Sequence, residues 1–465
     1  MATFVQWLDR IDQWVWGPPL LILLVAVGGY LTFILKGLQF RYFFYSHKLA
    51  FTRRDDGAQG DISQFQALMT TLATTIGIGS ITGVATAIAT GGVGALFWMW
   101  VTALFGMATK YAEAILAVKY RVVDEKGEMC GGPMYYLERG LKAKWLAVIF
   151  SVLTAISAFG TGNMVQANSV SEALYDLCGF NPLWTGLILA GVIGWALFGG
   201  IRSIAKVSSY LVPTMAIFYL IGGGLILAMQ YQAIPAALAA IFKSAFTGQA
   251  AVGGFLGSTV MIAIQMGVSR GVFSSDAGLG NSPIAAAAAK TDTPGRQALI
   301  SMCSVFITTC VICTITGLVI AVTGVLGQTG PTGEVLNGAV MALKAFDAVF
   351  PRGGLIVTIA IIPFAYSTIL GWAYFGEKCM EYLFGTRCVR WYRLVFTLMV
   401  VPGCLLSLQV VWGFANIMNG LMAFPNLIGL LGLSGVIAAE TKAFEAIVRR
   451  EKAQSKGAKA LSESL

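Results

Sequence analysis

Residues 74–83 read TTIGIGSITG and combine groups that bind ions of both signs. Gly77, Gly79 and Gly83 lie at the centre of an apolar segment, and each glycine costs a helix interior about 1 kcal/mol relative to alanine. We therefore expect the helix to break here. A broken helix frees amide N–H groups, which suit a carboxylate, and carbonyl oxygens, which suit a hard cation such as sodium.

Hydroxyl side chains surround these glycines. Thr74, Thr75 and Ser80 supply further oxygens for a cation, and the glycines permit unusual backbone angles. The alternative is that the glycines are packing residues, because small residues are frequent where membrane helices touch.

A second glycine cluster favours the binding site over simple packing. Segment 253–289 carries seven glycines together with Arg270 and Asp276, which we expect to form a gating ion pair. If the first span is set aside, the two interrupted spans are the first and the sixth of ten. Interrupted helices at matching positions of two inverted halves indicate a transport site near the middle of the membrane.

The elements that position these residues are membrane helices. The chain is 57% hydrophobic and 11% charged, against about 25% charged in a soluble protein. Long apolar runs predict helices rather than a barrel. We expect eleven spans, at 18–38, 65–90, 94–119, 145–170, 183–200, 204–229, 253–289, 295–324, 353–383, 391–411 and 414–440.

The predicted fold is an all-α polytopic membrane protein with a single transmembrane domain, residues 1–440. It divides into an extra helix at 18–38, a first repeat of five helices at 65–229 and a second, inverted repeat of five helices at 253–440. Residues 441–465 form a cytoplasmic tail whose polar end, from residue 451, is expected to be disordered.

The net charge of +9 follows the positive-inside rule and does not indicate nucleic acid. One set of alternate loops, with the C-terminal tail, holds 24 of the 31 Lys and Arg residues. This asymmetry predicts a multi-pass protein of the plasma membrane, in a bacterium the inner membrane, with the N-terminus outside and the C-terminus in the cytoplasm.

Other chemistry is disfavoured by what the chain lacks. With a single histidine, His47, it has no multi-histidine metal site or histidine relay, and the eight cysteines are read as free thiols. No HExxH or GxSxG motif and no filter-like repeat is present, so neither an enzyme nor an ion channel is favoured. Lys110 and Glu113 are read as a neutralising pair one helix turn apart.

Several long segments resemble the alanine/glycine:cation symporter family, also called sodium:alanine symporters. They include GDISQFQALMTTLATTIGIGSITGVATAIATGG (60–92), GTGNMVQANSV (160–170), SRGVFSSDAGLGNSPIAAAAAKTDTPGRQAL (269–299) and FAYSTILGWAYFGEKCMEYL (364–383). The resemblance implies a leucine-transporter-like fold. It also implies sodium-driven uptake of small neutral amino acids, chiefly alanine and glycine.

The resemblance also implies a substrate site. The N–H groups of Ile78 and Gly79 would hold the carboxylate, with Gly77 permitting the bend. Gln166 would face the substrate amino group, with Asn168 as a weaker candidate. Two departures from the family pattern bear on this site: Ile78 and Ser80 replace Thr and Asn, and Asp276 replaces Glu. Further candidates for the pocket wall are Ile262, Gln265, Met266, Phe273 and Trp372.

In this fold class a sodium ion lies between the first and the eighth core helix. The resemblance therefore pairs carbonyl groups of the first core helix with residues of the eighth. The full set of predicted sodium ligands is Ala73, Thr74, Thr75, Ile76, Ser80, Ala365, Ser367 and Thr368. The alternative for Ser367 and Thr368 is hydrogen bonding within their own helix. For Trp372, interfacial anchoring or packing is an equal alternative.

These observations predict a secondary active transporter that carries a small neutral amino acid and sodium into the cell by alternating access. Its partners would be the amino acid, the co-transported sodium ion and the lipid bilayer. Proton-coupled uptake is the alternative, and an ion channel is a more remote one. We expect no enzymatic activity.

Overall fold

The computed structural model of this chain describes residues 2–52, 59–197, 199–250, 257–330, 333–349 and 351–463. Helices dominate these ranges, as predicted. The only sheet within them is a short antiparallel hairpin that pairs β1 (Val122–Val123) with β2 (Met129–Cys130).

The first part of the chain, up to residue 247, contains one helix interrupted at the glycine cluster. Its elements are α1 (Ala2–Val15), α2 (Pro18–Ile34), α3 (Leu38–Arg41), α4 (Phe43–Phe51), α5 (Gln64–Thr75), η1 (Ile78–Ser80), α6 (Thr82–Gly91), α7 (Ala95–Lys119), α8 (Pro133–Tyr135), η2 (Tyr136–Gly140), α9 (Lys144–Ser157), η3 (Ala158–Met164), α10 (Val165–Cys178), α11 (Pro182–Leu197), α12 (Gly200–Met229), η4 (Tyr231–Ala233) and α13 (Ile234–Thr247).

The second part begins with the other interrupted helix. Its elements are α14 (Val260–Ser275), α15 (Pro283–Ala287), α16 (Pro294–Val305), η5 (Phe306–Ile312), α17 (Cys313–Thr323), α18 (Gly338–Asp347), α19 (Gly354–Phe384), η6 (Thr386–Cys388), α20 (Val389–Leu398), α21 (Val400–Leu405), α22 (Leu408–Gly432) and α23 (Ser434–Glu463).

The described residues contain 8 helices long and apolar enough to cross a membrane, or 9 if the bent pair at the first glycine cluster is one span. The predicted span 183–200 appears as the shorter helix α11. The predicted span 253–289 contains α14 and α15 with a linker between them, and its first four residues, 253–256, lie outside the described residues. The polytopic all-α class is therefore confirmed, while the count of eleven spans stays a prediction.

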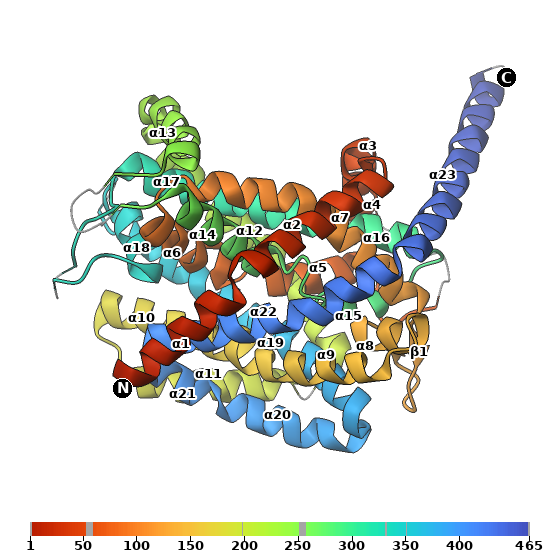
Figure 1. Cartoon of the computed structure of the whole chain (residues 1–465), viewed down its shortest axis with the longest axis horizontal. Helices are drawn as coiled ribbons and strands as arrows, with labels where there is room; N and C mark the ends of the chain where they lie inside the picture. The colour runs from red at the N-terminus through yellow and green to blue at the C-terminus, as the bar shows by residue number, and fades with distance from the viewer. Residues whose placement is uncertain are drawn as a thin grey trace.

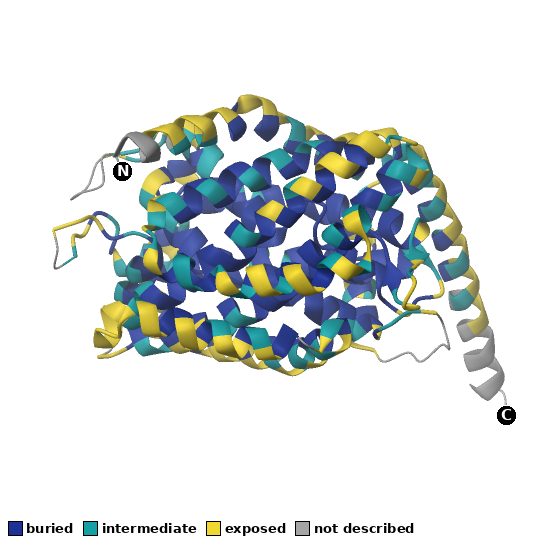
Figure 2. Ribbon diagram, turned by 90° about the horizontal axis from the view of Figure 1, so that it is seen from below, coloured by how far each residue is buried: buried dark blue, intermediate teal, exposed yellow. Residues whose placement is uncertain are grey.

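The two interrupted helices lie side by side in the middle of the bundle. Helix α14 packs against α6 and η1, α15 packs against α5, and α12 and α19 cover α5 from another side. Figure 1 shows α13, α17 and α18 near the end of the bundle that carries the N-terminus, and α3, α4, β1 and α23 at the opposite end. Buried residues fill the centre, and exposed residues mark the surface (Figure 2).

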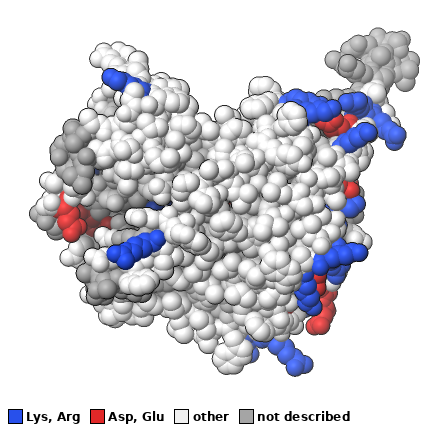
Figure 3. All heavy atoms as spheres, viewed as in Figure 1, with Lys and Arg blue, Asp and Glu red and all other residues white. Residues whose placement is uncertain are grey.

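In the view of Figure 3 most charged side chains lie toward the two ends of the molecule, with a few Lys or Arg at the lower edge, and uncharged residues cover the middle. Most of the visible Lys and Arg residues gather at the end where α23 lies. Large apolar side chains such as Phe33 (82% exposed) and Trp195 (80% exposed) cover the outside of the helices, as in a surface that faces lipid.

The expectation of a disordered tail is wrong for the described residues, because α23 continues to Glu463. The segment is polar but rich in Ala, Lys, Glu and Arg, which are strong helix formers. The predicted boundary at residue 440 is therefore not a helix end.

Candidate functional site

The first helix breaks where the sequence predicts. A capping box between Ser63 and Gln66 starts α5, which ends at Thr75. The short turn η1 follows, and then α6 leaves at an angle of 60° to α5. The break places the ends of two helices and several backbone groups at one buried point.

The glycines of the break are required for space rather than for backbone angles, which corrects the prediction. Gly77 has φ −118°, an extended conformation that other residues adopt. A Cβ on Gly77 would overlap the hydroxyl of Thr368. A Cβ on Gly79 would lie 2.8 Å from Cδ1 of Phe273, whereas at Gly83 the nearest atom is at 3.7 Å.

The N–H of Ile78 points at Gln166, as a substrate-binding donor would. The amide of Ile78 donates to Oε1 of Gln166 over 3.3 Å, and Nε2 of Gln166 donates to the carbonyl of Thr161 over 2.9 Å. Both Ile78 and Gln166 are buried. The structure thus brings together the predicted carboxylate donor and the predicted partner of the amino group.

The oxygens predicted to bind sodium also meet. The hydroxyl of Thr368 donates to the carbonyl of Ala73 over 2.9 Å, and that of Ser367 lies 3.4 Å from the same oxygen. Both hydroxyls also bond the carbonyl of Phe364 in their own helix, over 2.8 and 3.1 Å. The hydrogen bonds within the helix are therefore present, and sodium binding by these hydroxyls stays a prediction. Ile76 and Ala365 are buried in the same region.

The other hydroxyls of the first break have local partners. Thr74 and Thr75 donate to the carbonyl of Thr71, over 2.8 and 3.0 Å, so their hydroxyls bond the helix backbone. The hydroxyl of Ser80 lies 3.3 Å from that of Ser274 in α14. Ser80 therefore links the two broken helices.

Two predicted substrate residues lie against other elements. Nδ2 of Asn168 donates to the carbonyl groups of Gly403 and Leu406, over 3.3 and 2.8 Å, and so ties α10 to the α21 region. Nε2 of Gln265 donates to the carbonyl of Trp16 over 3.3 Å, near the N-terminal helix.

The two aromatic candidates differ in their place. Phe273 lies directly over Gly79 and stacks on Trp412, with ring centroids 4.9 Å apart. Trp372 is buried and packs against Gly162 of the π-helical segment η3, so it is not an interfacial anchor. Phe273 is the better placed of the two to close the site.

The second break is held by two charges that the sequence paired with each other. Oε1 of Glu113 accepts from the amides of Gly278 and Gly280, over 3.0 and 3.2 Å, and from Nδ2 of Asn426 over 2.6 Å. Nζ of Lys110 donates to the carbonyl of Ser275 over 2.9 Å. Lys110 and Glu113 therefore satisfy the backbone of the linker that follows α14.

The expected ion pair between Arg270 and Asp276 is wrong. Arg270 bonds Asn416, whereas the carboxylate of Asp276 interacts with Lys110. The reason is the break itself. Asp276 has φ +55° in the left-handed region, where the chain leaves the helix. Six residues also correspond to about 240° around an α-helix, so Arg270 and Asp276 lie on different faces.

A buried ammonium joins the β-hairpin to α19 at the end of the bundle that carries α23. Nζ of Lys378 lies 3.3, 3.0 and 3.0 Å from carboxylate oxygens of Asp124, Glu128 and Glu381. Burial raises the pKa of the Asp124 carboxyl, but the amide of Glu128, the Glu381 side chain and the charge of Lys378 outweigh burial and lower it to about 2. Sequence reasoning missed this cluster, because its members lie far apart in the chain.

Replacing Lys378 by Met is expected to destabilise the protein by about 3 kcal/mol, because removing one partner leaves buried carboxylates unpaired. The apparent melting temperature in detergent at pH 7 measures this loss. Lys344→Met is the control, since Lys344 is 37% exposed and its bridge to Asp176 spans 3.8 Å. Equal melting of both variants would contradict the prediction.

The contribution of Asp124 to folding stability depends on pH. It is complete above pH 3.8, the ordinary pKa of an Asp carboxyl, and is lost as the pH falls toward 2, the pKa of Asp124 in the folded protein.

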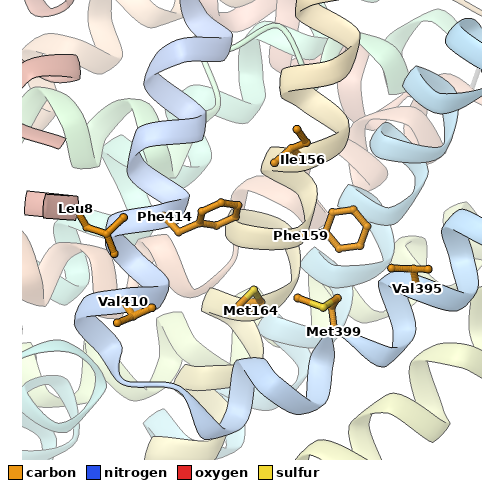
Figure 4. A pocket seen from close by; sticks show the side chains of 8 residues that line it. All are labelled: Leu8, Ile156, Phe159, Met164, Val395, Met399, Val410 and Phe414. Carbon is orange, nitrogen blue, oxygen red and sulfur yellow. The ribbon is translucent and has the colours of Figure 1, made fainter. Parts of the chain in front are cut away.

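A large cavity elsewhere in the molecule does not suit an amino acid. It has a volume of about 420 Å³ and is lined only by apolar side chains, which Figure 4 shows: Leu8, Ile156, Phe159, Met164, Val395, Met399, Val410 and Phe414. A zwitterion buried there would have no polar partners among these residues. The breaks, not this cavity, are the candidate site.

A bundle of membrane helices with two broken helices side by side, presenting amides and oxygens at buried ends, defines a membrane transporter and not an enzyme. The chain belongs to the sodium:alanine symporter family, whose family model matches residues 1–458. The resemblance found in the sequence is thereby confirmed.

Named relatives agree with this membership. The chain is 53% identical over 453 residues to the sodium/alanine symporter AgcS of Methanococcus maripaludis, covering 96% of this chain and 99% of AgcS. It is 37% identical over 429 residues to the probable sodium/glutamine symporter GlnT of Bacillus subtilis, covering 92% and 88% of the two chains. Both names support sodium-coupled symport of an amino acid.

The fold is that of the leucine-transporter class. The crystal structure of MhsT in complex with L-phenylalanine superposes with a TM-score of 0.60, covering 83% of this chain and 93% of MhsT. At 13% sequence identity this likeness concerns the fold alone.

Proposed function

We propose that this protein is a sodium-coupled symporter of small neutral amino acids, alanine and glycine, that works by alternating access. The observation that carries the proposal is the meeting of the Ile78 amide, Gln166 and the oxygens around Ala73 at one buried break. Membership of the sodium:alanine symporter family supports it.

The sodium ion would bind between α5 and α19. The carbonyl groups of Ala73, Ile76 and Ala365 and the hydroxyls of Ser367 and Thr368 form a neutral oxygen set, which suits a monovalent hard cation. The hydroxyl of Thr368 donates its proton to the carbonyl oxygen of Ala73 in this structure. For both oxygens to bind sodium, the O–H of Thr368 would have to rotate away from that carbonyl.

The amino acid would bind beside the sodium site. Its carboxylate would take the N–H of Ile78 and replace Oε1 of Gln166, which is then free to accept from the substrate ammonium. Phe273 lies close over Gly79, which leaves room for a small side chain and disfavours a large one. This supports alanine and glycine as substrates.

Every one of these groups is buried, so substrate enters and leaves only when the helices move. Rocking of the broken helices would open the site to each side in turn. The gathering of Lys and Arg at the α23 end in Figure 3 supports a cytoplasmic C-terminus and an outer N-terminus, in the inner membrane of a bacterium.

Uptake of labelled alanine into proteoliposomes tests the proposal. An inward sodium gradient at constant pH should drive accumulation, and replacing sodium by choline should abolish it. Unchanged accumulation in choline, or accumulation driven by a proton gradient alone, would overturn sodium coupling.

The same assay tests the sodium ligands. Thr368→Val keeps the shape of the side chain but removes the hydroxyl. Losing one ligand to sodium is expected to cost about 1.4 kcal/mol of binding free energy, which raises the half-saturating sodium concentration roughly tenfold. Thr358→Val is the matched control on α19, because its hydroxyl bonds only Gly354 of its own helix. A similar sodium dependence in both variants would reject the Thr368 assignment.

A further inference from the structure

Arg270 is a buried cation that the substrate and sodium sites do not use. It lies in α14, one helix turn before Phe273, and its side chain is 6% exposed. Its guanidinium stacks over the ring of Trp412 at 4.5 Å, and Nη1 donates to Oδ1 of Asn416 over 2.8 Å. Burial of a full charge is costly unless it is matched by such partners, so the contact needs an explanation.

The partner of Arg270 continues directly to the site. The Trp412 ring stacks on Phe273 with centroids 4.9 Å apart and an interplanar angle of 31°. Phe273 in turn touches the backbone of Gly79 at the first break. Arg270, Trp412 and Phe273 therefore form a continuous stack that ends on the proposed carboxylate cradle.

The other side of Arg270 reaches α1, which lies outside both predicted repeats. Nδ2 of Asn416 lies 3.4 Å from a carboxylate oxygen of Asp12, and Asp12 stabilises the charged form of Arg270. Nε1 of Trp16 donates to the carbonyl of Asn416 over 2.9 Å. Helix α1 packs along α22 and so fixes the residues that hold the guanidinium.

We propose that Arg270 is a positioning residue of an outer lid, in which α1, through Asp12 and Asn416, holds the guanidinium on Trp412 and thereby keeps Phe273 over the bound amino acid. The charge of Arg270 orients the tryptophan ring, and the ring carries the orientation to Phe273. Helix α1 thus takes part in closing the site and is more than a peripheral membrane anchor.

The assignment of this lid to the transport cycle rests on the proposed function, but its test does not. Gly83 lies in the first turn of α6, and a Cβ there would face the Trp412 ring at 3.7 Å, an ordinary contact distance. Gly83→Cys therefore places a thiol against the lid. The background carries Cys178→Ser, because Cys178 is exposed. A membrane-impermeant thiosulfonate then reports opening of the lid in the full-length protein in proteoliposomes.

Labelling of the cysteine at position 83 is expected to be about tenfold faster in Arg270→Gln, since the lost cation–π and hydrogen-bond contacts no longer favour the closed lid. Arg270→Lys, which keeps a cation over the ring, should restore most of the protection. Asp12→Asn should give a smaller increase. Arg10→Gln is the matched control, because Arg10 is an exposed cation on the same helix.

The outcomes separate the lid from the transport function. Labelling that is unchanged in Arg270→Gln, in protein that melts as the parent does, overturns the lid. An equal increase in Arg270→Lys also overturns it, because the charge would then be irrelevant. If Arg270→Gln fails to fold, Asp12→Asn decides: an unchanged rate rejects the lid and a faster rate supports it. Faster labelling without sodium-driven alanine uptake in the parent would support the lid and reject the proposed function.

Discussion

Sodium-driven alanine uptake is expected to fall at least a hundredfold when Gly77 is replaced by alanine. The added Cβ would overlap the hydroxyl of Thr368, and the nearest atom of Gln166 lies 3.4 Å from it. One methyl group therefore disturbs the sodium oxygens and the carboxylate cradle together. A site built to about 0.5 Å loses function when it is displaced by about an ångström, typically by about a hundredfold.

The matched control is Gly83→Ala in the same glycine cluster. Its Cβ would meet only Trp412, at an ordinary contact distance of 3.7 Å, so uptake should stay near that of the parent. Uptake in proteoliposomes, with melting in detergent to establish folding, measures both variants. Normal uptake by Gly77→Ala would show that the break is not the binding site. An equal loss in both variants would reduce the glycines to packing residues.

The breaks themselves were predictable because their cause is local. Glycine and serine, joined by threonine in the first segment, crowd the middle of each interrupted segment, and no neighbouring helix is needed to see that the backbone is weak there. Ser367 and Thr368 were predictable only through the family resemblance. Their helix is regular, and nothing in its periodicity says that these hydroxyls face Ala73.

Asn168 and Gln265 show where such reasoning stops. Each is a polar residue on a helix of the core, but the backbone groups that each one satisfies belong to segments far away in the chain. The side chain of Asn168 is directed by packing against the α21 region, and that of Gln265 by packing against Trp16. A polar side chain in a membrane helix needs a partner, and the sequence does not say which one.

Lys110 and Glu113 carry the more general lesson. Their spacing suggests that they neutralise one another, and each does stabilise the charge of the other. They also meet the free backbone groups of the second break. An unwound segment inside a membrane must have its amides and carbonyls satisfied by other protein groups. Two buried charges on a neighbouring helix can therefore indicate a partner for unwound backbone. The backbone of the second break is satisfied by the charged side chains of Lys110 and Glu113, whereas at the first break the amide of Ile78 bonds the neutral side chain of Gln166.

Glu113→Leu is accordingly expected to destabilise the protein by several kcal/mol. It leaves the amides of Gly278 and Gly280 and the side chain of Asn426 without their common acceptor. Each buried donor without a partner costs about 1–3 kcal/mol, out of a total stability of about 5–15 kcal/mol. The melting temperature in detergent should fall steeply, and little folded protein should be recovered.

Glu113→Gln separates the hydrogen bonds from the charge. Its Oε1 can still accept from the linker amides, so most of the stability lost in Glu113→Leu should return, although Lys110 loses a nearby negative charge. If Glu113→Gln melts as low as Glu113→Leu, the charge rather than the acceptor holds the linker. If both variants melt as the parent does, the linker between α14 and α15 does not depend on Glu113. The amides of Gly278 and Gly280 would then have hydrogen-bond acceptors other than Glu113.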